Sequence, residues 1–181
     1  TIRQTVDKLV PGKTYAASIW ASIDGERGIS FSAESAPASA SPFTDKLAWK
    51  TSTSVKSLGG DRLPRLFDGN PDTLWHSVEA KDEATKQPHS VTVSFGKDTP
   101  LEGFVQICRK DKGNGAIKGY IAETSADGKS WKPAAKGEFD YGDTVTATVK
   151  FTKPIKARFF KLTATSTLTG KPFTSIAELD F

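Results

Sequence analysis

A chain of 181 residues with 36% hydrophobic residues, four Trp and eleven Phe can fill one globular core, or one core plus a fragment, and is not a disordered polypeptide. No run approaches the ~18 apolar residues of a membrane helix, so we expect no membrane insertion. The net charge of +4 comes from lysines scattered among acidic and small polar residues, without a basic run, which argues against a nucleic-acid-binding protein.

The first part of the chain, residues 1–35, has the pattern of short strands, over residues 1–9, 14–23 and 28–33, separated by Pro11-Gly12 and Asp24-Gly25 turns. Two or three strands are rarely stable alone in water. We therefore expect the tail of an adjoining β-sandwich, or strands docked on the following domain. The turn over residues 9–15 resembles that of fibronectin type III sandwiches.

A stretch of Ser, Ala and Pro over residues 35–42 predicts a linker, because these residues cannot build a core. The sequence therefore predicts a partial N-terminal segment over residues 1–43 and a domain over residues 44–181. Because the chain begins inside a predicted strand, we expect it to be a piece of a longer protein.

The domain over residues 44–181 shows many short strands and almost no helical periodicity. Residues 90–95 alternate apolar Val91, Val93 and Phe95 with polar residues, which is typical of a half-buried strand. Turn signals at residues 96–100, 127–128 and 140–143 separate further segments of this kind. The strands are predicted over residues 46–53, 90–95, 101–109, 119–125, 131–136, 144–151 and 158–165. Such spacing indicates an all-β, antiparallel sandwich.

The segment Arg-Leu-Phe-Asp-Gly-Asn-Pro-Asp-Thr-Leu-Trp-His-Ser, residues 65–77, is dense in residues that favour tight turns. It offers the Asp68 carboxylate, the carbonyls of Arg65 and Asn70, and the hydroxyl and carbonyl of Thr73. Calcium requires such an all-oxygen set, although the spacing matches no EF-hand. The residues alone leave two interpretations open, a metal loop and a turn with ordinary polar caps.

Several segments carry a family resemblance. Asp-Gly-Asn-Pro-Asp-Thr-Leu-Trp-His-Ser over residues 68–77, together with residues 90–96, 123–131, 157–162 and 175–179, resembles the discoidin, or coagulation factor 5/8 type C, family. The similarity is greatest to its bacterial sugar-binding branch, carbohydrate-binding module family 32. The resemblance covers residues 44–181 and implies a discoidin-like antiparallel jelly roll.

The resemblance also implies a structural calcium ion, Ca2+, that joins the early loop to the last strand. Its ligands would be the carbonyls of Arg65, Asn70 and Ala177, both oxygens of Thr73, and the carboxylates of Asp68 and Glu178. The alternative is a polar turn and a surface glutamate.

A sugar pocket follows from the same resemblance. Arg109 would bind two ring hydroxyls, His76 an axial hydroxyl and Phe173 the apolar face of the ring, with Asn114 as a weaker candidate. Each has a simpler alternative, since His76 could cap a strand and Arg109 could lie in a solvated loop. Many relatives carry an acidic residue where this chain has only uncharged residues and Lys56 within residues 52–57. That difference leaves the preference for galactose open.

Catalysis is not expected. The chain has two histidines and shows no Gly-x-Ser-x-Gly motif, zinc spacing or glycine-rich phosphate loop. Its single cysteine, Cys108, permits no internal disulfide and is expected to be buried.

The predicted function is therefore a non-catalytic module for a glycan bearing galactose or N-acetylgalactosamine. We expect it to be monomeric and to belong to a larger secreted or surface-bound bacterial enzyme. Two alternatives are a membrane- or protein-binding discoidin module, for which Leu58, Val78 and Phe173 are the candidate apolar contacts, and a spacer without a ligand.

Overall fold

The structure is a computed structural model that describes residues 46, 48–60, 62–78 and 86–181. The predicted strands and linker over residues 1–43 lie outside the described residues. Their assignment to a separate segment stays a prediction.

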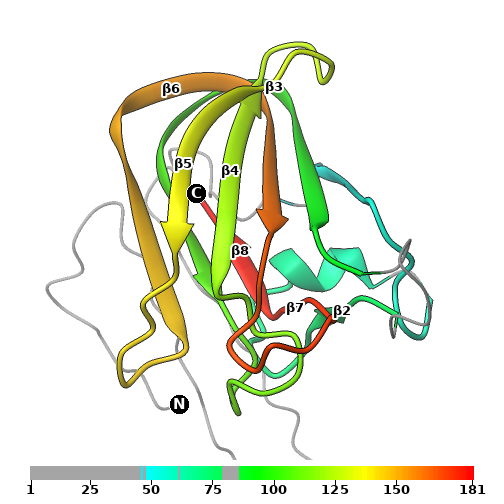
Figure 1. Ribbon diagram of the computed structural model, residues 1–181. Helices are drawn as coiled ribbons and strands as arrows, with labels where there is room; N and C mark the ends of the chain where they lie inside the picture. The colour runs from blue at the N-terminus through cyan, green and yellow to red at the C-terminus, as the bar shows by residue number, and fades with distance from the viewer. Residues whose placement is uncertain (1–45, 47, 61, 79–85) are drawn as a thin grey trace, which may run out of the picture. The chain divides into compact units, whose positions relative to one another are not determined.

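The described chain is built almost entirely of strands, with one short 3-10 helix, η1 (Figure 1). In chain order the elements are β1 Lys50–Thr53, η1 Leu63–Phe67, β2 Trp75–His76, β3 His89–Ile107, β4 Gly119–Ser125, β5 Lys132–Glu138, β6 Thr146–Ala164, β7 Ser175–Ile176 and β8 Glu178–Asp180. The all-β prediction is confirmed, and β4 has the predicted bounds.

The long strands β3 and β6 differ from the prediction, which divided each into two strands, with a turn over residues 96–100 in the case of β3. In β3, buried Val91, Val93 and Phe95 are followed by the exposed or half-buried residues 96–100, and burial resumes at Leu101. The pairing with β6 continues through this bend, with Thr99 opposite Ala157, after a register shift. The prediction of separate strands was wrong because a β-bulge bends a strand pair without ending its ladder.

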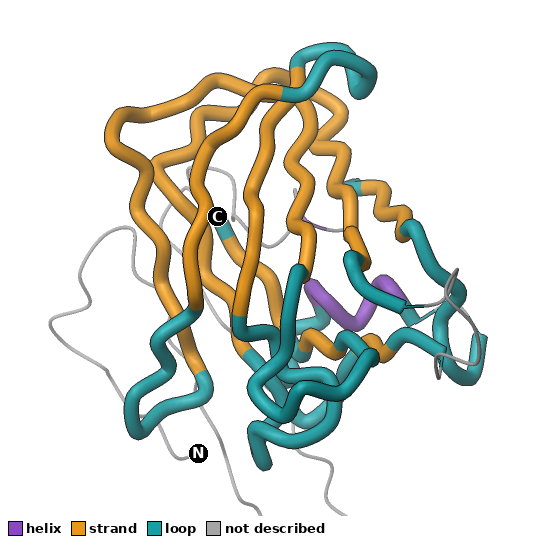
Figure 2. Tube along the Cα trace, in the orientation of Figure 1, coloured by secondary structure: helices purple, strands orange, loops and turns teal. Residues whose placement is uncertain are grey.

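These two bent strands join the layers of a sandwich (Figure 1). One layer has the order β1-β3-β6-β4-β5. The second half of β3 instead pairs with β8, through Val105 opposite Asp180, and with the first half of β6. Strands that pass from one layer to the other form the corner of a β-sandwich. In Figure 2 these bends lie at the upper end of the molecule and most loops lie toward the lower end.

The core between the layers is rich in aromatic side chains. Phe104 and Phe160 are buried with ring centroids 5.1 Å apart, and Trp49 packs edge-on against Phe67 and Phe95. Such edge-to-face contacts add to the stabilisation that comes from burial of the rings. Cys108 is fully buried, as predicted.

Candidate functional site

The small two-stranded sheet of β2 and β7 positions the first candidate residue. Trp75 is fully buried, and its indole N–H donates to the Ser57 hydroxyl over 2.7 Å. Because successive side chains of a strand point to opposite faces, His76 is directed away from the core. It is half-buried and lies opposite Ser175 in the ladder.

His76 and Phe173 are neighbours. Their ring centroids are 5.7 Å apart, with a tilt of 40° between the ring planes. The Nδ1 atom of His76 lies 2.5 Å from the carbonyl oxygen of Ser77. A carbonyl oxygen only accepts, so Nδ1 carries the proton, and in the neutral ring Nε2 is left as an acceptor.

The backbone that carries Phe173 is held by hydrogen bonds to a distant part of the chain. The side-chain amide nitrogen of Gln87, Nε2, donates to the Phe173 carbonyl over 2.8 Å and to the Thr174 hydroxyl over 3.2 Å. The backbone N–H of Thr174 donates to the hydroxyl of buried Ser77 over 3.0 Å. Phe173 is half-buried, so its ring is fixed in position and partly accessible.

Arg109 is engaged by its own loop. Its Nε and one terminal nitrogen donate to the two carboxylate oxygens of Asp111, over 2.6 and 3.0 Å, and the other terminal nitrogen donates to the Asn114 carbonyl over 3.1 Å. Hydrogen bonds from Arg109 and from the Gly113 N–H hold the pKa of the Asp111 carboxyl below its usual value. A guanidinium has five N–H groups, so two remain for a ligand.

The Arg109 loop is joined to the β2–β7 sheet through Ser175. The Ser175 hydroxyl donates to the Asn114 carbonyl over 3.0 Å, and its backbone N–H donates to the Gly115 carbonyl over 2.8 Å. Gly115 has a φ of 85°, and a Cβ there would lie 2.7 Å from the Ser175 nitrogen, so only glycine permits this approach. Ser175 lies opposite His76 in the β2–β7 ladder, so its contacts bring Arg109 and Asn114 to the side of His76 and Phe173. Asn114 is exposed, and its contacts here are through its carbonyl oxygen.

The predicted metal ligands also converge. The Thr73 hydroxyl donates to the Asp68 carboxylate over 2.6 Å and lies 3.1 Å from the Asn70 carbonyl. Glu178, at the start of β8, contacts the Asp68 carboxylate. Arg65 lies in η1 and interacts electrostatically with Asp68.

Two carboxylates thus face each other at this point. Burial, followed by the hydrogen bond and negative charge of Asp68, raises the pKa of Glu178 to about 7. Burial also acts to raise the pKa of Asp68, but hydrogen bonds from Thr73 and from the Asn70 N–H outweigh it and lower that pKa. The Oε1 atom of Glu178 is buried without a hydrogen-bond partner among the described residues.

These oxygens fit a hard cation, which would neutralise the paired carboxylates and give the Glu178 Oε1 atom a partner. Within the described part of the chain, no three His, Cys, Asp or Glu side chains group as metal ligands. A metal would therefore depend on backbone carbonyls such as those of Arg65, Asn70 and Ala177.

An ion pair between Lys110 and Asp72 links the two candidate sites. Lys110 follows Arg109 directly, and Asp72 precedes Thr73 in the oxygen-rich loop. Both side chains are well exposed, so the pair contributes little stability by itself. It does restrict the positions that one loop takes relative to the other.

Sequence reasoning missed two contributors, Asp111 and Gln87. Asp111 lies two residues after Arg109, a spacing that permits the observed pairing. No local signal identifies Gln87, because it acts on a residue far away in sequence. Asp111 also supplies a carboxylate at this end of the sandwich, where residues 52–57 supply none.

The apolar side chains considered for membrane binding differ in exposure. Leu58 is 46% exposed, whereas Val78 is half-buried and packs against the core. No helix in the described residues is long and apolar enough to span a membrane.

Residues 49–179 match the family model of the F5/8 type C domain. Galactose oxidase of Gibberella zeae is 33% identical over 124 residues, and a sialidase of Micromonospora viridifaciens is 31% identical over 121 residues. The matched stretches cover 67% and 66% of this chain but only 18% of each enzyme.

Solved structures with a similar fold include three modules from Clostridium perfringens. The family 32 carbohydrate-binding module of NanJ, in complex with galactose, is 27% identical, with a TM-score of 0.62, over 77% of this chain and 94% of that module. The module CpGH89CBM32-5, in complex with GalNAc-β-1,3-galactose, is 26% identical, with a TM-score of 0.65, over 77% and 96% of the two chains. The module CBM32-3 of a family 31 glycoside hydrolase is also 26% identical, with a TM-score of 0.65, over 75% and 90%.

Proposed function

The chain belongs to the F5/8 type C domain family, and from that premise we propose that it is a non-catalytic module that binds a galactose- or N-acetylgalactosamine-type sugar. It has the fold of a family 32 carbohydrate-binding module. The observation that carries the proposal is the convergence of His76, Phe173 and Arg109 at one end of the sandwich.

Each of these side chains has a role suited to a sugar ring. The Phe173 ring packs against the apolar face of the sugar, as aromatic faces do with apolar surfaces. The two N–H groups of Arg109 that remain free of Asp111 and Asn114 donate to neighbouring hydroxyls. His76 accepts a hydrogen bond from a further hydroxyl through Nε2.

We propose that the oxygen-rich loop holds a structural calcium ion. Its ligands are the carboxylates of Asp68 and Glu178, Thr73, and the carbonyls of Arg65, Asn70 and Ala177. The paired carboxylates and the unpartnered Oε1 of Glu178 support this site. Bound calcium supplies positive charge and rigidity, and takes no part in catalysis.

The biological role that we propose is to hold a larger glycan-degrading enzyme near its substrate. A shallow pocket for one sugar ring gives modest affinity, but tethering raises the effective concentration of the enzyme at its substrate. Support comes from the matches to a sialidase and to modules of glycoside hydrolases. The module is proposed to act as a monomer, outside the cytoplasm of a bacterium.

The decisive experiment is a glycan array on the purified chain, followed by calorimetric titration of the best ligand. We expect glycans with terminal galactose or N-acetylgalactosamine to bind. Arg109→Ala should abolish measurable binding, while Arg158→Ala, which removes a guanidinium at the other end of the sandwich, should leave it unchanged. Binding of anionic vesicles without any glycan ligand would contradict the proposal and favour the membrane-binding alternative.

A further inference from the structure

The end of the sandwich opposite the candidate sugar site carries a concentration of positive charge. Here β3 and β6 bend from one layer to the other, and every charged side chain on the bend is exposed. We call this surface the basic corner, and it consists of Lys97, Asp98, Glu102, Lys150, Lys153, Lys156 and Arg158. Five of these are basic and two are acidic, in a chain whose total net charge is +4.

Much of this charge is not neutralised within the molecule. Asp98 is shared by two cations, since its oxygens lie 3.4 Å from the Lys156 ammonium and 3.2 Å from the Arg158 guanidinium. Lys150 and Lys153 form no ion pair with any residue that the structure describes. The basic corner therefore presents a positive potential to solvent.

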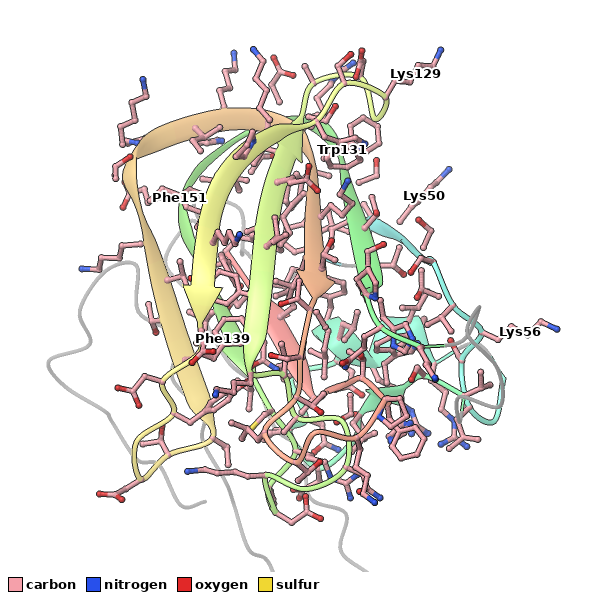
Figure 3. All side chains as sticks on the ribbon, in the orientation of Figure 1. Lys50, Lys56, Lys129, Trp131, Phe139 and Phe151 are labelled. Atoms are coloured by element: carbon pink, nitrogen blue, oxygen red, sulfur yellow. The ribbon has the colours of Figure 1, made fainter. Side chains whose placement is uncertain are left out.

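A hollow of about 470 Å³ lies within the basic corner. Its base includes the apolar side chains of Phe104, Val149 and Phe151, and its rim includes Glu102, Lys150 and Lys153. Thr148 and Thr152 add hydroxyl groups to the lining. Figure 3 shows Phe151 at this bend, with blue-tipped side chains extending to solvent along the same edge of the molecule.

The basic corner is separate from the candidate sugar site. Along the second half of β3 and the residues after it, Glu102 on the rim of the hollow lies seven residues before Arg109. At about 3.3 Å per residue this is roughly 20 Å. A ligand at the basic corner therefore does not compete for His76, Arg109 or Phe173.

The chemistry of the basic corner selects among anionic partners. The exposed large apolar side chains of the described residues are Leu58 and Leu168, and neither lies here to enter a membrane. The rings of Phe104 and Phe151 are only 2% and 9% exposed, so they offer no platform for nucleic-acid bases. Glu102 on the rim repels any anionic group beside it but accepts hydrogen bonds from hydroxyl groups, so the rim favours a ligand whose negative charges are separated by hydroxyl groups.

We propose that the basic corner binds a polyuronate, an anionic polysaccharide with a carboxylate on each sugar. Lys150 and Lys153 pair with carboxylates, while Glu102, Thr148 and Thr152 hydrogen-bond to sugar hydroxyls. The module thus has a second, charge-dependent contact with glycans, independent of the neutral-sugar pocket. The contact weakens as salt screens the exposed charges.

The test measures binding of polygalacturonate by calorimetry at low ionic strength, using the full chain. We expect the double variant Lys150→Thr/Lys153→Thr to bind about tenfold more weakly, because it loses two exposed ion pairs. The matched control Lys56→Thr/Lys171→Thr removes the same charge away from the bend and should bind as the parent does; Lys56 lies away from the bend in Figure 3, and the exposed Lys171 lies two residues before Phe173. Equal melting temperatures of the three proteins show that both variants fold.

Three results would overturn the proposal. These are no binding of polygalacturonate by the parent, an equal loss in the control variant, and equal or tighter binding of single-stranded DNA or phosphatidylserine vesicles. Titration with galactose separates the two sites, because the basic-corner variant should bind galactose as the parent does. Absence of galactose binding in every protein would count against the pocket and not against the basic corner.

Discussion

Asp111 holds Arg109 in one orientation at the candidate sugar site. Both carboxylate oxygens accept from the guanidinium, and one also accepts from the Gly113 N–H over 2.9 Å. An exposed arginine without such a partner samples many rotamers and loses that freedom when it binds. Asp111 thus orients Arg109 before any ligand binds, and adds a charged acceptor beside it.

We expect Asp111→Asn to weaken sugar binding about fivefold to tenfold, because the charge-assisted contact becomes a neutral one. Titration calorimetry with the ligand found by the array measures the change. Asp140→Asn is the matched control, since Asp140 accepts from the Gly142 N–H over 2.9 Å in a similar exposed turn. An unchanged dissociation constant in Asp111→Asn would show that Arg109 needs no such support.

Individual site residues were predictable where the family resemblance placed them. His76 and Phe173 are neighbours, and Arg109 and Asn114 are linked to them through Ser175; their roles in sugar binding stay a prediction. The orientation of the Arg109 guanidinium was not predictable, because its hydrogen bonds to Asp111 and Asn114 depend on the conformation of residues 109–115. The contribution of Gln87 depends on a contact across 86 residues, which no local pattern encodes.

At the scale of elements, η1 and the loop after it are joined to β8 through Asp68 and Glu178. Without a cation, this junction brings two carboxylates together and leaves the Glu178 Oε1 atom without a described partner. When Glu178 is ionised, repulsion between the two carboxylates opposes the packing of β8 against η1. A divalent cation would turn the same contact into an attractive one.

We therefore expect calcium to stabilise the chain. At a concentration about 100 times the dissociation constant, a ligand of the folded state contributes about 2.7 kcal/mol, or roughly 10 °C in melting temperature for a domain of this size. Scanning calorimetry with calcium and with chelator measures the shift. Glu178→Gln should remove most of it, and Glu138→Gln, an exposed carboxylate on β5, should not. A chelator that leaves the melting temperature unchanged would rule out the site.

The turn between β4 and β5 depends on the charge of Asp127. Its carboxylate accepts from the backbone N–H groups of Ser130 and Lys129, each over 2.8 Å, and from the Ser125 hydroxyl over 2.9 Å. These hydrogen bonds lower the pKa of Asp127 to about 2. The stabilisation is present above the ordinary pKa of 3.8 and is lost as pH falls toward 2.

We expect the free energy of unfolding of the parent to exceed that of Asp127→Asn by a constant amount above about pH 4, with the difference shrinking below it. Urea denaturation of both proteins across this range measures the difference. Asp143→Asn, which removes one exposed carboxylate from another turn, is the control for the loss of charge. A difference between parent and Asp127→Asn that persists unchanged at pH 2 would contradict the assignment.

Short strands were the easier elements to predict. The alternation of Val91, Val93 and Phe95 gave the correct face for the first half of β3. The continuity of β3 through residues 96–100 was not predictable, because Gly96 and Pro100 are typical turn residues. In the structure they lie in a bulged bend where pairing with β6 persists.

At the scale of the whole molecule, the two layers are held together by aromatic packing. Phe160 is fully buried, with ring centroids 5.1 Å from Phe104 and 4.8 Å from Phe181. Its neighbour Phe159 points to the other face of β6 and is half-buried. The two residues differ mainly in which side of the sheet they occupy.

Phe160→Ala should lower the free energy of unfolding by about 3–5 kcal/mol, because it leaves a cavity between the layers. Phe159→Ala should cost less than about 1.5 kcal/mol, since its side chain is only partly removed from water. Urea denaturation monitored by tryptophan fluorescence distinguishes the two. Equal losses of unfolding free energy in the two variants would mean that Phe160 does not lie in the core as its contacts indicate.

The β3–β6 ladder also has a consequence for folding. It pairs Ile107 with Thr146 at one end and His89 with Ala164 at the other, so each step toward His89 closes a longer loop of chain. The pocket draws on three distant stretches, around His76, Arg109 and Phe173, that meet only when this ladder is complete. The proposed sugar binding therefore requires the complete ladder: a fragment that lacks any of these three stretches should not bind, and a newly made chain should bind only once the ladder has formed.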